Sequence, residues 1–462
     1  MSNRETIPEL EKEKIPISNP TDEHHVYIEW YLNGRAGGPP GYLANLLYGY
    51  NQVSNYDEPL IIFNSFHGSE PPKASPKKPM IPALIKGFCS IFPGGRDFFV
   101  EHISRTQKKA FRDMTTFLSD PDKIMPDAGL IATIDFSRTK SIHVHTVAEV
   151  VKIKNYLRKN YLDNIKVILT CHTPESFAKE QYALSIAGGQ SEKRARIIEN
   201  MWLSLEKQGY READVMIFPS KEAMEPLLHD IPEFKDIVKT KDIRFMATGS
   251  KRICSSLTKE EAKKKYGVGG KTVIGYIGRH NSVKGYDLLK EAAQKILNQR
   301  DDVVFLIGGA QGNEFAPLDN PSWIEAGWVN PSDMLRAVDV FALPNRQTYY
   351  DLVLLEVLSM GIPVVATATG GNKSVKEIAD DLVLCSVDSG SLADAIVNVI
   401  SLSQNELAAK GERLQERYEN YFTEKHMAER YVETIRQIYN DYDLWEKKEV
   451  SLEHDKRNCS NI

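Results

Sequence analysis

The chain alternates short apolar or β-branched runs with longer helical patterns, and this alternation limits its fold more than any other feature. In the first half the apolar runs lie at residues 25–32, 59–66, 141–146, 166–171 and 214–220. Helical patterns follow most of them, at residues 42–53, 147–160, 191–210 and 221–229. Parallel strands need long crossover connections, which are usually helices. The alternation therefore predicts a parallel α/β sheet.

A second series of the same kind starts near residue 242. Its apolar runs lie at about residues 242–247, 272–278, 302–309, 339–344, 362–367 and 382–386, and its helical patterns at about 285–299, 352–360, 373–380 and 391–402. A chain of 462 residues exceeds what one core usually serves. We therefore expect an α/β protein with two Rossmann-like domains, whose parallel sheets face each other across a cleft and bind ligands at the carboxyl ends of their strands.

Domain limits follow from the same pattern. We place the first domain at residues 25–245 and the second at 246–422, followed by a separate helix at 423–447. The polar, aperiodic ends, residues 1–24 and 448–462, are predicted to be tails.

An insertion at about residues 68–125 interrupts the first domain. Its segment 70–99 is rich in Pro and Lys and then apolar. Two interpretations stay open: a mobile surface loop with one buried helix, or a basic and apolar surface for a lipid-linked or protein acceptor.

Composition narrows the class of partner. Hydrophobic residues at 42% and charged residues at 26% are typical of a soluble globular protein, and a net charge of −5 gives no general attraction to nucleic acid. The 5 cysteines are scattered, without a CxxC pair, which argues against a disulfide framework or a structural zinc. No signal peptide or membrane span is evident, so we expect a cytoplasmic protein, and peripheral contact with the inner face of the membrane stays open.

One glutamate, Glu356, interrupts the apolar segment "LVLLEVLSMGIP". Asp351 is expected to cap a helix over residues 352–360, which Gly361 and Pro363 end. Apolar residues surround this helix, so it should be buried. A buried carboxylate is costly without a partner. Glu356 therefore either forms a structural ion pair or lines a cleft and accepts hydrogen bonds from the hydroxyls of a polar ligand.

The surroundings of this helix favour an anionic ligand. The helix starts directly after a strand and a polar loop, so its free N–H groups point to the carboxyl edge of the sheet, where a phosphate is stabilised. Arg279 follows a strand that ends at Gly278, and Lys284 precedes the helix at about residue 285. Cations beside a helix start suggest an anion between them, although Lys284 alone is equally consistent with a solvated side chain. We expect a diphosphate clamp.

Two glycine-containing motifs of the chain are candidates for ligand binding. Gly370 and Gly371 permit close approach of the backbone to a ligand, although such a pair is also common in plain turns. The run "GVGGKT" mimics the end of a P-loop, but Lys265 stands where the first Gly should be, and the run precedes a strand. No GxGxxG opens either half, which disfavours dinucleotide redox chemistry.

Together these motifs resemble glycosyltransferase family 4, the retaining enzymes of the GT-B fold. The motifs that carry the resemblance are "GYIGRHNSVKG", "FLIGG", "GWVNPSDMLRAVDVFALP" and "LVLLEVLSMGIPVVATATGG", in the order of the family. A weaker match covers the first domain through "GGPPGYLANLLYG", "SIHVHT", "VILTCHTPES" and "EADVMIFPS". The helix at 423–446 resembles the C-terminal helix that crosses back to the first domain in this fold.

The resemblance implies a nucleotide-sugar donor held mainly by the second domain. Glu356 corresponds to the second glutamate of the family's E-x7-E motif, which binds the ribose hydroxyls. Arg279 and Lys284 match the pair that neutralises the leaving diphosphate, assisted by amides around Leu352 and Val353. His172 falls where the family places a histidine near the transferred sugar.

The resemblance extends to the other donor-binding positions, and one of them departs from the family. Gly37, Gly38, Gly278, Gly370, Gly371, Thr348 and Asp351 complete the expected donor site. Thr348 stands where the first glutamate of the motif should contact the transferred sugar, so donor identity stays open. Asp351 or Asn345 is a candidate to replace that carboxylate in part, although Asp351 is expected to be occupied as the helix cap.

The function that follows is a hexosyltransferase of class EC 2.4. It would move a hexose from a nucleoside diphosphate sugar, with UDP as the commonest donor of the family, to a hydroxyl of a growing glycan, a lipid-linked saccharide or a protein. We expect no cofactor and no metal, since no DxD motif with ligand-spaced carboxylates is evident. Two alternatives stay open: a sugar-nucleotide 2-epimerase of the same fold, and a non-catalytic nucleotide-sugar-binding subunit.

Overall fold

The computed structural model describes residues 22–29, 38–53, 60–65, 115, 118–309 and 314–459. Gly37 and most of the predicted insertion lie outside the described residues.

The first domain is built on a sheet of six parallel strands in the order β2-β1-β3-β4-β5-β6. These strands are β1 (Glu23–Ile28), β2 (Leu60–Ser65), β3 (Thr139–Val144), β4 (Lys166–Leu169), β5 (Val215–Phe218) and β6 (Asp242–Phe245). The last of them, β6, pairs in parallel with β5. β6 therefore belongs to the first sheet, within the limits placed at residues 25–245, and only the grouping of this run with the second series is wrong. An apolar run shows that a strand forms, but not which sheet it joins.

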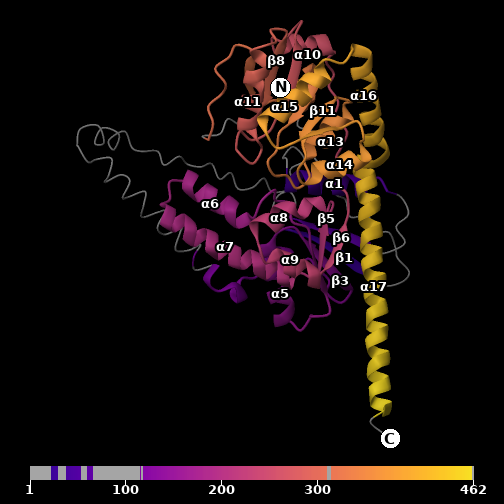
Figure 1. Cartoon of the computed structure of the whole chain (residues 1–462). Helices are drawn as coiled ribbons and strands as arrows, with labels where there is room; N and C mark the ends of the chain where they lie inside the picture. The colour runs from indigo at the N-terminus through magenta and orange to yellow at the C-terminus, as the bar shows by residue number, and fades with distance from the viewer. Residues whose placement is uncertain are drawn as a thin grey trace, which may run out of the picture.

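Helices connect these strands and cover the sheet. They are α1 (Pro39–Tyr50), α4 (Ala128–Ile131), α5 (Val147–Lys159), α6 (Phe177–Ala187), α7 (Glu192–Glu212), α8 (Glu225–Asp230) and α9 (Phe234–Ile237), with short 3₁₀ turns η1 (Pro121–Lys123), η2 (Glu222–Met224) and η3 (Val238–Thr240). The pair α6 and α7 projects from the domain as a helical hairpin (Figure 1). The sequence did not predict α6, because only Ala178 of this helix is buried and no apolar face repeats along it.

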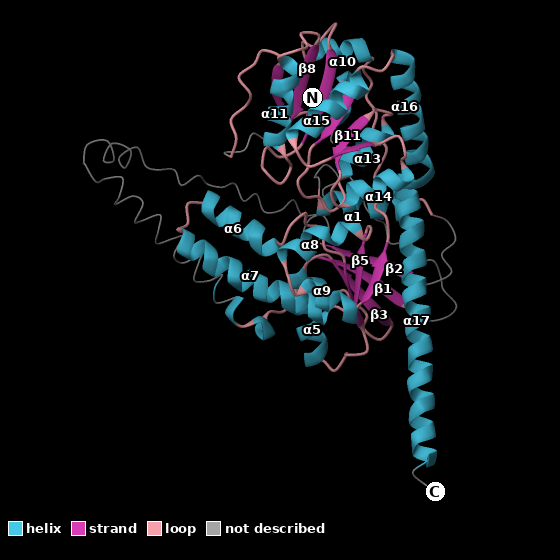
Figure 2. Cartoon of the chain, viewed as in Figure 1, coloured by secondary structure: helices cyan, strands magenta, loops and turns pink. Residues whose placement is uncertain are grey.

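The second domain repeats the architecture with six parallel strands in the order β12-β11-β10-β7-β8-β9. Its strands are β7 (Thr272–Ile277), β8 (Val303–Gly308), β9 (Trp323–Gly327), β10 (Val340–Leu343), β11 (Val364–Thr367) and β12 (Val383–Cys385). Its helices are α10 (Lys259–Lys265), α11 (Tyr286–Leu297), α12 (Pro331–Ala337), α13 (Leu352–Ser359), α14 (Gly371–Ile378), α15 (Ser389–Ile400) and α16 (Gln404–Arg417). Figure 2 shows the two sheets in separate halves of the molecule, which confirms the predicted pair of Rossmann-like domains.

A single long helix, α17 (Glu424–Cys459), returns from the second domain to the first and lies along it (Figure 1). It follows a π-helical turn, η4 (Tyr418–Phe422), at the end of α16. Tyr431 and Ile435 of α17 are fully buried in one apolar cluster with Leu43 of α1. The helix continues past residue 447 to Cys459, so the expectation of a tail from residue 448 does not hold. A polar composition is compatible with a helix as well as with a tail.

No helix in the described ranges combines the length and the apolar character that a membrane crossing requires.

Replacing Gly49 by Ala tests how α17 sits on the first domain. A Cβ at Gly49 would overlap the carbonyl oxygen of Glu424 and lie 3.1 Å from Ala428 Cβ, so the backbones would have to move apart. Overpacking of this kind costs about 1–3 kcal/mol, which outweighs the gain in helix propensity. Gly49→Ala should lower the free energy of unfolding by that amount in chemical denaturation. Gly269→Ala, where nothing lies within 4 Å, is the control, and equal stability of the two variants would contradict this packing.

Candidate functional site

The carboxyl ends of the two sheets meet at an aromatic contact. His172 follows β4 of the first domain, and Tyr349 lies in the loop after β10 of the second. Their ring centroids are 6.2 Å apart in an edge-on arrangement. His172 also lies against Tyr42 of α1, with ring centroids 4.4 Å apart. The structure thus brings the first-domain histidine beside the segment that carries Thr348 and Asp351, as a cleft between the sheets requires.

A buried ion pair organises the second-domain side of this cleft. Lys284 Nζ lies 2.7 Å from Asp351 Oδ2, and Asn345 Nδ2 donates to the same oxygen at 2.6 Å. Burial alone would raise the pKa of Asp351, but the Lys284 ammonium and the Asn345 amide hold it below its ordinary value. Asp351 is therefore an ionised carboxylate at neutral pH.

The expected capping role of Asp351 is wrong. Asp351 stands at the N-cap position of α13, but its side chain accepts no hydrogen bond from that helix. The carboxylate instead accepts hydrogen bonds from Lys284 and Asn345. A full charge offers a stronger hydrogen-bond partner than a backbone N–H.

Glu356 lies on the less buried face of α13. Leu354, Leu355, Val357 and Leu358 are buried, whereas Leu352, Val353 and Glu356 keep partial exposure. Residues four apart on a helix share a face, so the Glu356 side chain leaves α13 on the same side as Leu352, the first residue of the helix. Within the described part of the chain, no hydrogen bond or ion pair joins the Glu356 side chain to another residue.

The charge state of Glu356 follows from its surroundings. Burial and the nearby Asp351 carboxylate raise the pKa of Glu356 to about 7. The structural ion pair considered from the sequence is not formed with any described lysine or arginine. A desolvated carboxyl without a protein partner is suited to accept hydrogen bonds from ligand hydroxyls.

Arg279 reaches across the cleft. It follows β7, its side chain is 61% exposed, and Nη1 lies 3.4 Å from Glu180 Oε1 in α6 of the first domain. Tyr276 donates a hydrogen bond of 2.8 Å to the Arg279 carbonyl oxygen and steadies the backbone there. Arg279 and Lys284 open and close the same loop before α11. The anions beside them in this structure are Glu180 and Asp351.

The predicted glycines have different roles. Gly38, just before α1, has a φ of 69° and nothing within 4 Å of a Cβ position, so it leaves the first-domain side of the cleft open. A Cβ at Gly370 would overlap the carbonyl oxygen of Thr348, and one at Gly371 that of Tyr349. Close packing of the α14 start on the loop after β10 therefore accounts for this glycine pair. Gly278 donates its N–H to Gly308 O at 3.1 Å at the end of β7.

His172 is held in a neutral state. Its Nε2 lies 3.1 Å from His145 Nδ1. Burial lowers the pKa of His172 to about 3. A neutral pair of imidazoles shares one proton in such a bond, so one ring donates and the other accepts. His172 can therefore orient a ligand hydroxyl, but it carries no positive charge at neutral pH.

Two contacts between the domains gave no signal in the sequence. Glu225, the first residue of α8, accepts a hydrogen bond of 3.1 Å from the Gly370 N–H and pairs with Lys373 at 2.8 Å. Tyr349 is buried against His172 and Phe218 of the first domain. Only the fold shows which charges and rings meet across the cleft.

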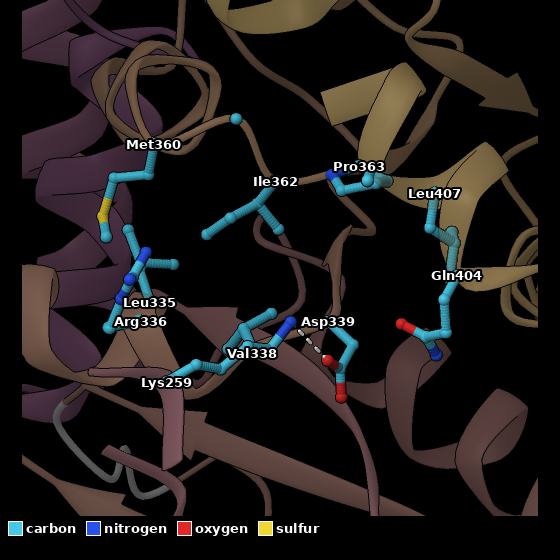
Figure 3. A pocket seen from close by; sticks show the side chains of 12 residues that line it. Lys259, Leu335, Arg336, Val338, Asp339, Met360, Ile362, Pro363, Gln404 and Leu407 are labelled. Carbon is cyan, nitrogen blue, oxygen red and sulfur yellow. Dashed lines mark ion pairs between the residues drawn. The ribbon is translucent and has the colours of Figure 1, made fainter. Parts of the chain in front are cut away.

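A cavity of about 190 Å³ lies elsewhere in the second domain (Figure 3). It is lined by Lys259, Leu335, Arg336, Val338, Asp339, Met360, Gly361, Ile362, Pro363, Gln404, Leu407 and Ala408. Asp339 and Pro363 directly precede β10 and β11, so this cavity lies at the amino ends of the strands, opposite the cleft. Among the described residues, no group of three or more His, Cys, Asp or Glu side chains is arranged to hold a metal ion.

Comparison with known proteins bears on this site. Residues 271–401 match the family model described as "Glycosyl transferases group 1". The chain is 26% identical over 267 residues to D-inositol 3-phosphate glycosyltransferase of Corynebacterium urealyticum. The matched segment covers 51% of this chain and 59% of the relative. The chain is 27% identical over 210 residues to N-acetyl-alpha-D-glucosaminyl L-malate synthase of Bacillus anthracis, covering 42% and 54%. The chain thus spans little more than half the length of these curated relatives.

Solved structures agree on the fold. Sucrose-phosphate synthase from Thermosynechococcus elongatus superposes with a TM-score of 0.57 at 16% identity, covering 91% of this chain and 100% of that one. The Anabaena protein HepE, solved in complex with UDP and glucose, gives 0.52 at 13% identity, covering 90% and 100%. The predicted resemblance is supported by the family model, and the predicted GT-B fold is confirmed. The segment that matches the family model contains Arg279, Lys284, Asp351 and Glu356.

Replacing Glu356 by Gln should change how stability depends on pH. Because the pKa of Glu356 is raised from 4.5 to about 7, the folded chain binds more protons than the unfolded chain between these two values. The contribution of Glu356 to stability is therefore present below pH 4.5 and is lost as the pH rises through 7. Glutamine does not titrate, so Glu356→Gln should gain stability over the wild type between pH 5 and pH 8, by up to roughly 3 kcal/mol.

Denaturant titrations at pH 5, 6, 7 and 8 measure this difference. Glu377→Gln, at an exposed glutamate of α14, controls for the loss of a surface charge. A difference between Glu356→Gln and wild type that stays constant over this range would show that Glu356 has a partner in solution.

Proposed function

We propose that this chain is a retaining glycosyltransferase that moves a hexose from a nucleoside diphosphate sugar, with UDP as the nucleotide, to a hydroxyl acceptor. The observation that carries the proposal is the Glu356 carboxyl, which has no hydrogen-bond or ion-pair partner among the described residues and lies one turn from the free N–H groups that open α13. Four residues along a helix rise about 6 Å. This spacing suits a ribose at the carboxyl and a diphosphate at the helix start.

The comparisons support a glycosyltransferase but do not identify its substrates. The matched segment, residues 271–401, includes the cations Arg279 and Lys284 as well as Glu356. The Anabaena protein of similar fold was solved with UDP-glucose as well as with UDP and glucose. A UDP-sugar is therefore the first donor to test.

The chemistry assigns a role to each group. The bond from the anomeric carbon to the diphosphate oxygen breaks, the acceptor oxygen forms a new bond on the same face of the sugar, and the acceptor proton passes to the leaving diphosphate. Negative charge grows on the diphosphate, where Arg279, Lys284 and the amides of Leu352 and Val353 stabilise it. This set of positive groups can act without a metal. His172 would orient the transferred sugar as a neutral hydrogen-bonding group.

Donor binding would rearrange the ion pairs of the cleft. Lys284 would share its charge between Asp351 and the diphosphate, and Arg279 would exchange Glu180 for phosphate oxygens. The acceptor hydroxyl would belong to a growing glycan, a lipid-linked saccharide or a protein. We place the reaction in the cytoplasm, on the scattered cysteines, and include peripheral contact with the membrane for a lipid-linked acceptor.

One observation favours a second candidate, a nucleotide-sugar-binding subunit without activity. Thr348, at the position of the first motif glutamate, is only 1% exposed and is covered by Gly370. Slow hydrolysis of the donor by the pure protein separates the two candidates, because a pure binder shows affinity without turnover. Release of an altered sugar without an acceptor would instead indicate a 2-epimerase.

A panel of UDP, GDP and ADP sugars in a thermal-shift assay tests donor binding first. A ligand that binds only the folded state raises the melting temperature. We expect the largest shift with a UDP-sugar. No shift with any nucleotide sugar would contradict the proposed function.

Replacing Arg279 or Lys284 by Ala should then cut turnover by on the order of 100-fold or more, because each removes a group that stabilises the leaving diphosphate. Lys265→Ala is the matched control, since Lys265 also pairs with an aspartate, Asp333 at 2.8 Å, in the same domain and outside the cleft. Melting temperatures show whether each variant is folded. Unchanged turnover in both Arg279→Ala and Lys284→Ala would contradict the proposal that these two residues stabilise the leaving diphosphate.

A further inference from the structure

The cavity of about 190 Å³ at the amino ends of the second-domain strands has an apolar floor and a polar rim. Its floor consists of buried apolar residues, namely Leu335, Val338, Ile362, Pro363 and Leu407. Its rim carries the half-buried Lys259 and the exposed Arg336 and Gln404, and Figure 3 shows Arg336 and Gln404 at opposite sides of the space. Small-molecule sites combine an apolar lining with a few polar groups in this way. A cavity of about 150 Å³ holds a benzene ring, so this one has room for a single ring or a short aliphatic chain.

The charges at the rim favour an anion. Asp339 is already neutralised, because Lys259 Nζ lies 2.6 Å from its Oδ1 and Lys263 Nζ lies 2.7 Å from its Oδ2. Arg336 donates through Nε to the Leu257 carbonyl oxygen at 3.2 Å. Its two terminal nitrogens make no hydrogen bond or ion pair with any residue in the described ranges. A guanidinium group whose two terminal nitrogens are available is suited to a carboxylate or a phosphate.

The walls of the cavity are held in place by the protein itself. Met360 and Ile362 follow α13, and Gln404 belongs to α16. A Cβ at Gly411 of α16 would overlap the Gly361 carbonyl oxygen, so the two segments pack backbone to backbone. A site that is formed in advance loses little conformational freedom when a ligand binds.

The cavity also lies beside both connections between the domains. Leu257, which Arg336 holds, belongs to the segment that links β6 to α10. The other connection is α16, which continues through η4 into α17. A molecule in the cavity would therefore contact α12, the end of α13 and α16 at the junction of the two domains.

We propose that this cavity binds a small organic anion. The carboxylate or phosphate group of the anion lies beside Arg336 and Lys259, and its apolar body covers Val338, Ile362 and Leu407. The site is at the opposite edge of the sheet from the cleft, so it is independent of the proposed function.

NMR titration of the methyl-labelled chain with benzoate, phenyl phosphate and benzyl alcohol tests the proposal. The three probes share a ring and differ in charge. Benzoate or phenyl phosphate should shift the methyl signals of Met360 and Ile362, and leave those of Leu352 and Val353 at the start of α13 unchanged. Benzyl alcohol should bind about tenfold more weakly or worse, because it lacks the charge that Arg336 would pair with.

Two variants at exposed positions test the two parts of the site. Arg336→Gln should weaken binding of the anionic probe by about tenfold or more, and Arg336→Lys should restore part of the loss. Ala408 is exposed on α16 and lines the cavity, so Ala408→Phe should fill the space from the surface and abolish binding. Melting temperatures show that each variant is folded.

The matched control is Arg300→Gln. Arg300 precedes β8 at the same edge of the sheet, pairs with Asp302 at 2.7 Å and is not among the residues that line the cavity, so its replacement should leave the titrations unchanged. The inference is overturned if neither anion shifts the signals of Met360 and Ile362, or if benzyl alcohol binds as well as the anions. Equal binding by the wild type and Arg336→Gln, or shifts confined to Leu352 and Val353, would overturn it as well.

Discussion

Parallel pairing of the strands is the constraint on which the rest of this structure depends. Since all strands of a sheet run in one direction, every loop that leaves a strand end reaches the same edge. In the second domain this brings Arg279, Asp351 and the start of α13 to one edge, although their sequence positions differ widely. In the first domain, the parallel strands likewise bring His172, which follows β4, to the carboxyl edge of the sheet. The cleft is where these two edges meet.

Two nearby carboxyl groups in the cleft, those of Asp351 and Glu356, have pKa values shifted in opposite directions. Asp351 is ionised because Lys284 and Asn345 satisfy it, and its charge then raises the pKa of Glu356. Breaking a buried ion pair by removing one partner is costly. In the proposed function, a diphosphate that approaches Lys284 would therefore share this lysine with Asp351. Thr348 stands where the motif has its first carboxylate, so Asp351 is the carboxylate nearest to this position in the chain.

Contacts between the domains oppose opening of the cleft. Glu225 holds both Lys373 and the Gly370 N–H, Tyr349 packs on His172, and Arg279 lies beside Glu180. The helix α17 adds a covalent tether, since it leaves the second domain and packs on α1 of the first. The exposed pair between Arg279 and Glu180 contributes little to stability, so in the proposed function a diphosphate would replace it at low cost.

The sequence by itself determined both sheets, most strand and helix positions, and the unusual place of Glu356, because hydrophobic periodicity and helix end signals are local. It did not reveal α6, of which only Ala178 is buried, or the extent of α17 beyond residue 447, and its apolar runs grouped β6 with the second series. The tertiary structure alone decided that Asp351 pairs with Lys284 instead of capping α13, and that Tyr349 packs against His172 and Phe218 of the first domain. The physical reason is that ion pairs and ring contacts form between residues that are close in space but far apart in the sequence. Hydrophobic periodicity and helix end signals reflect only residues that are a few positions apart.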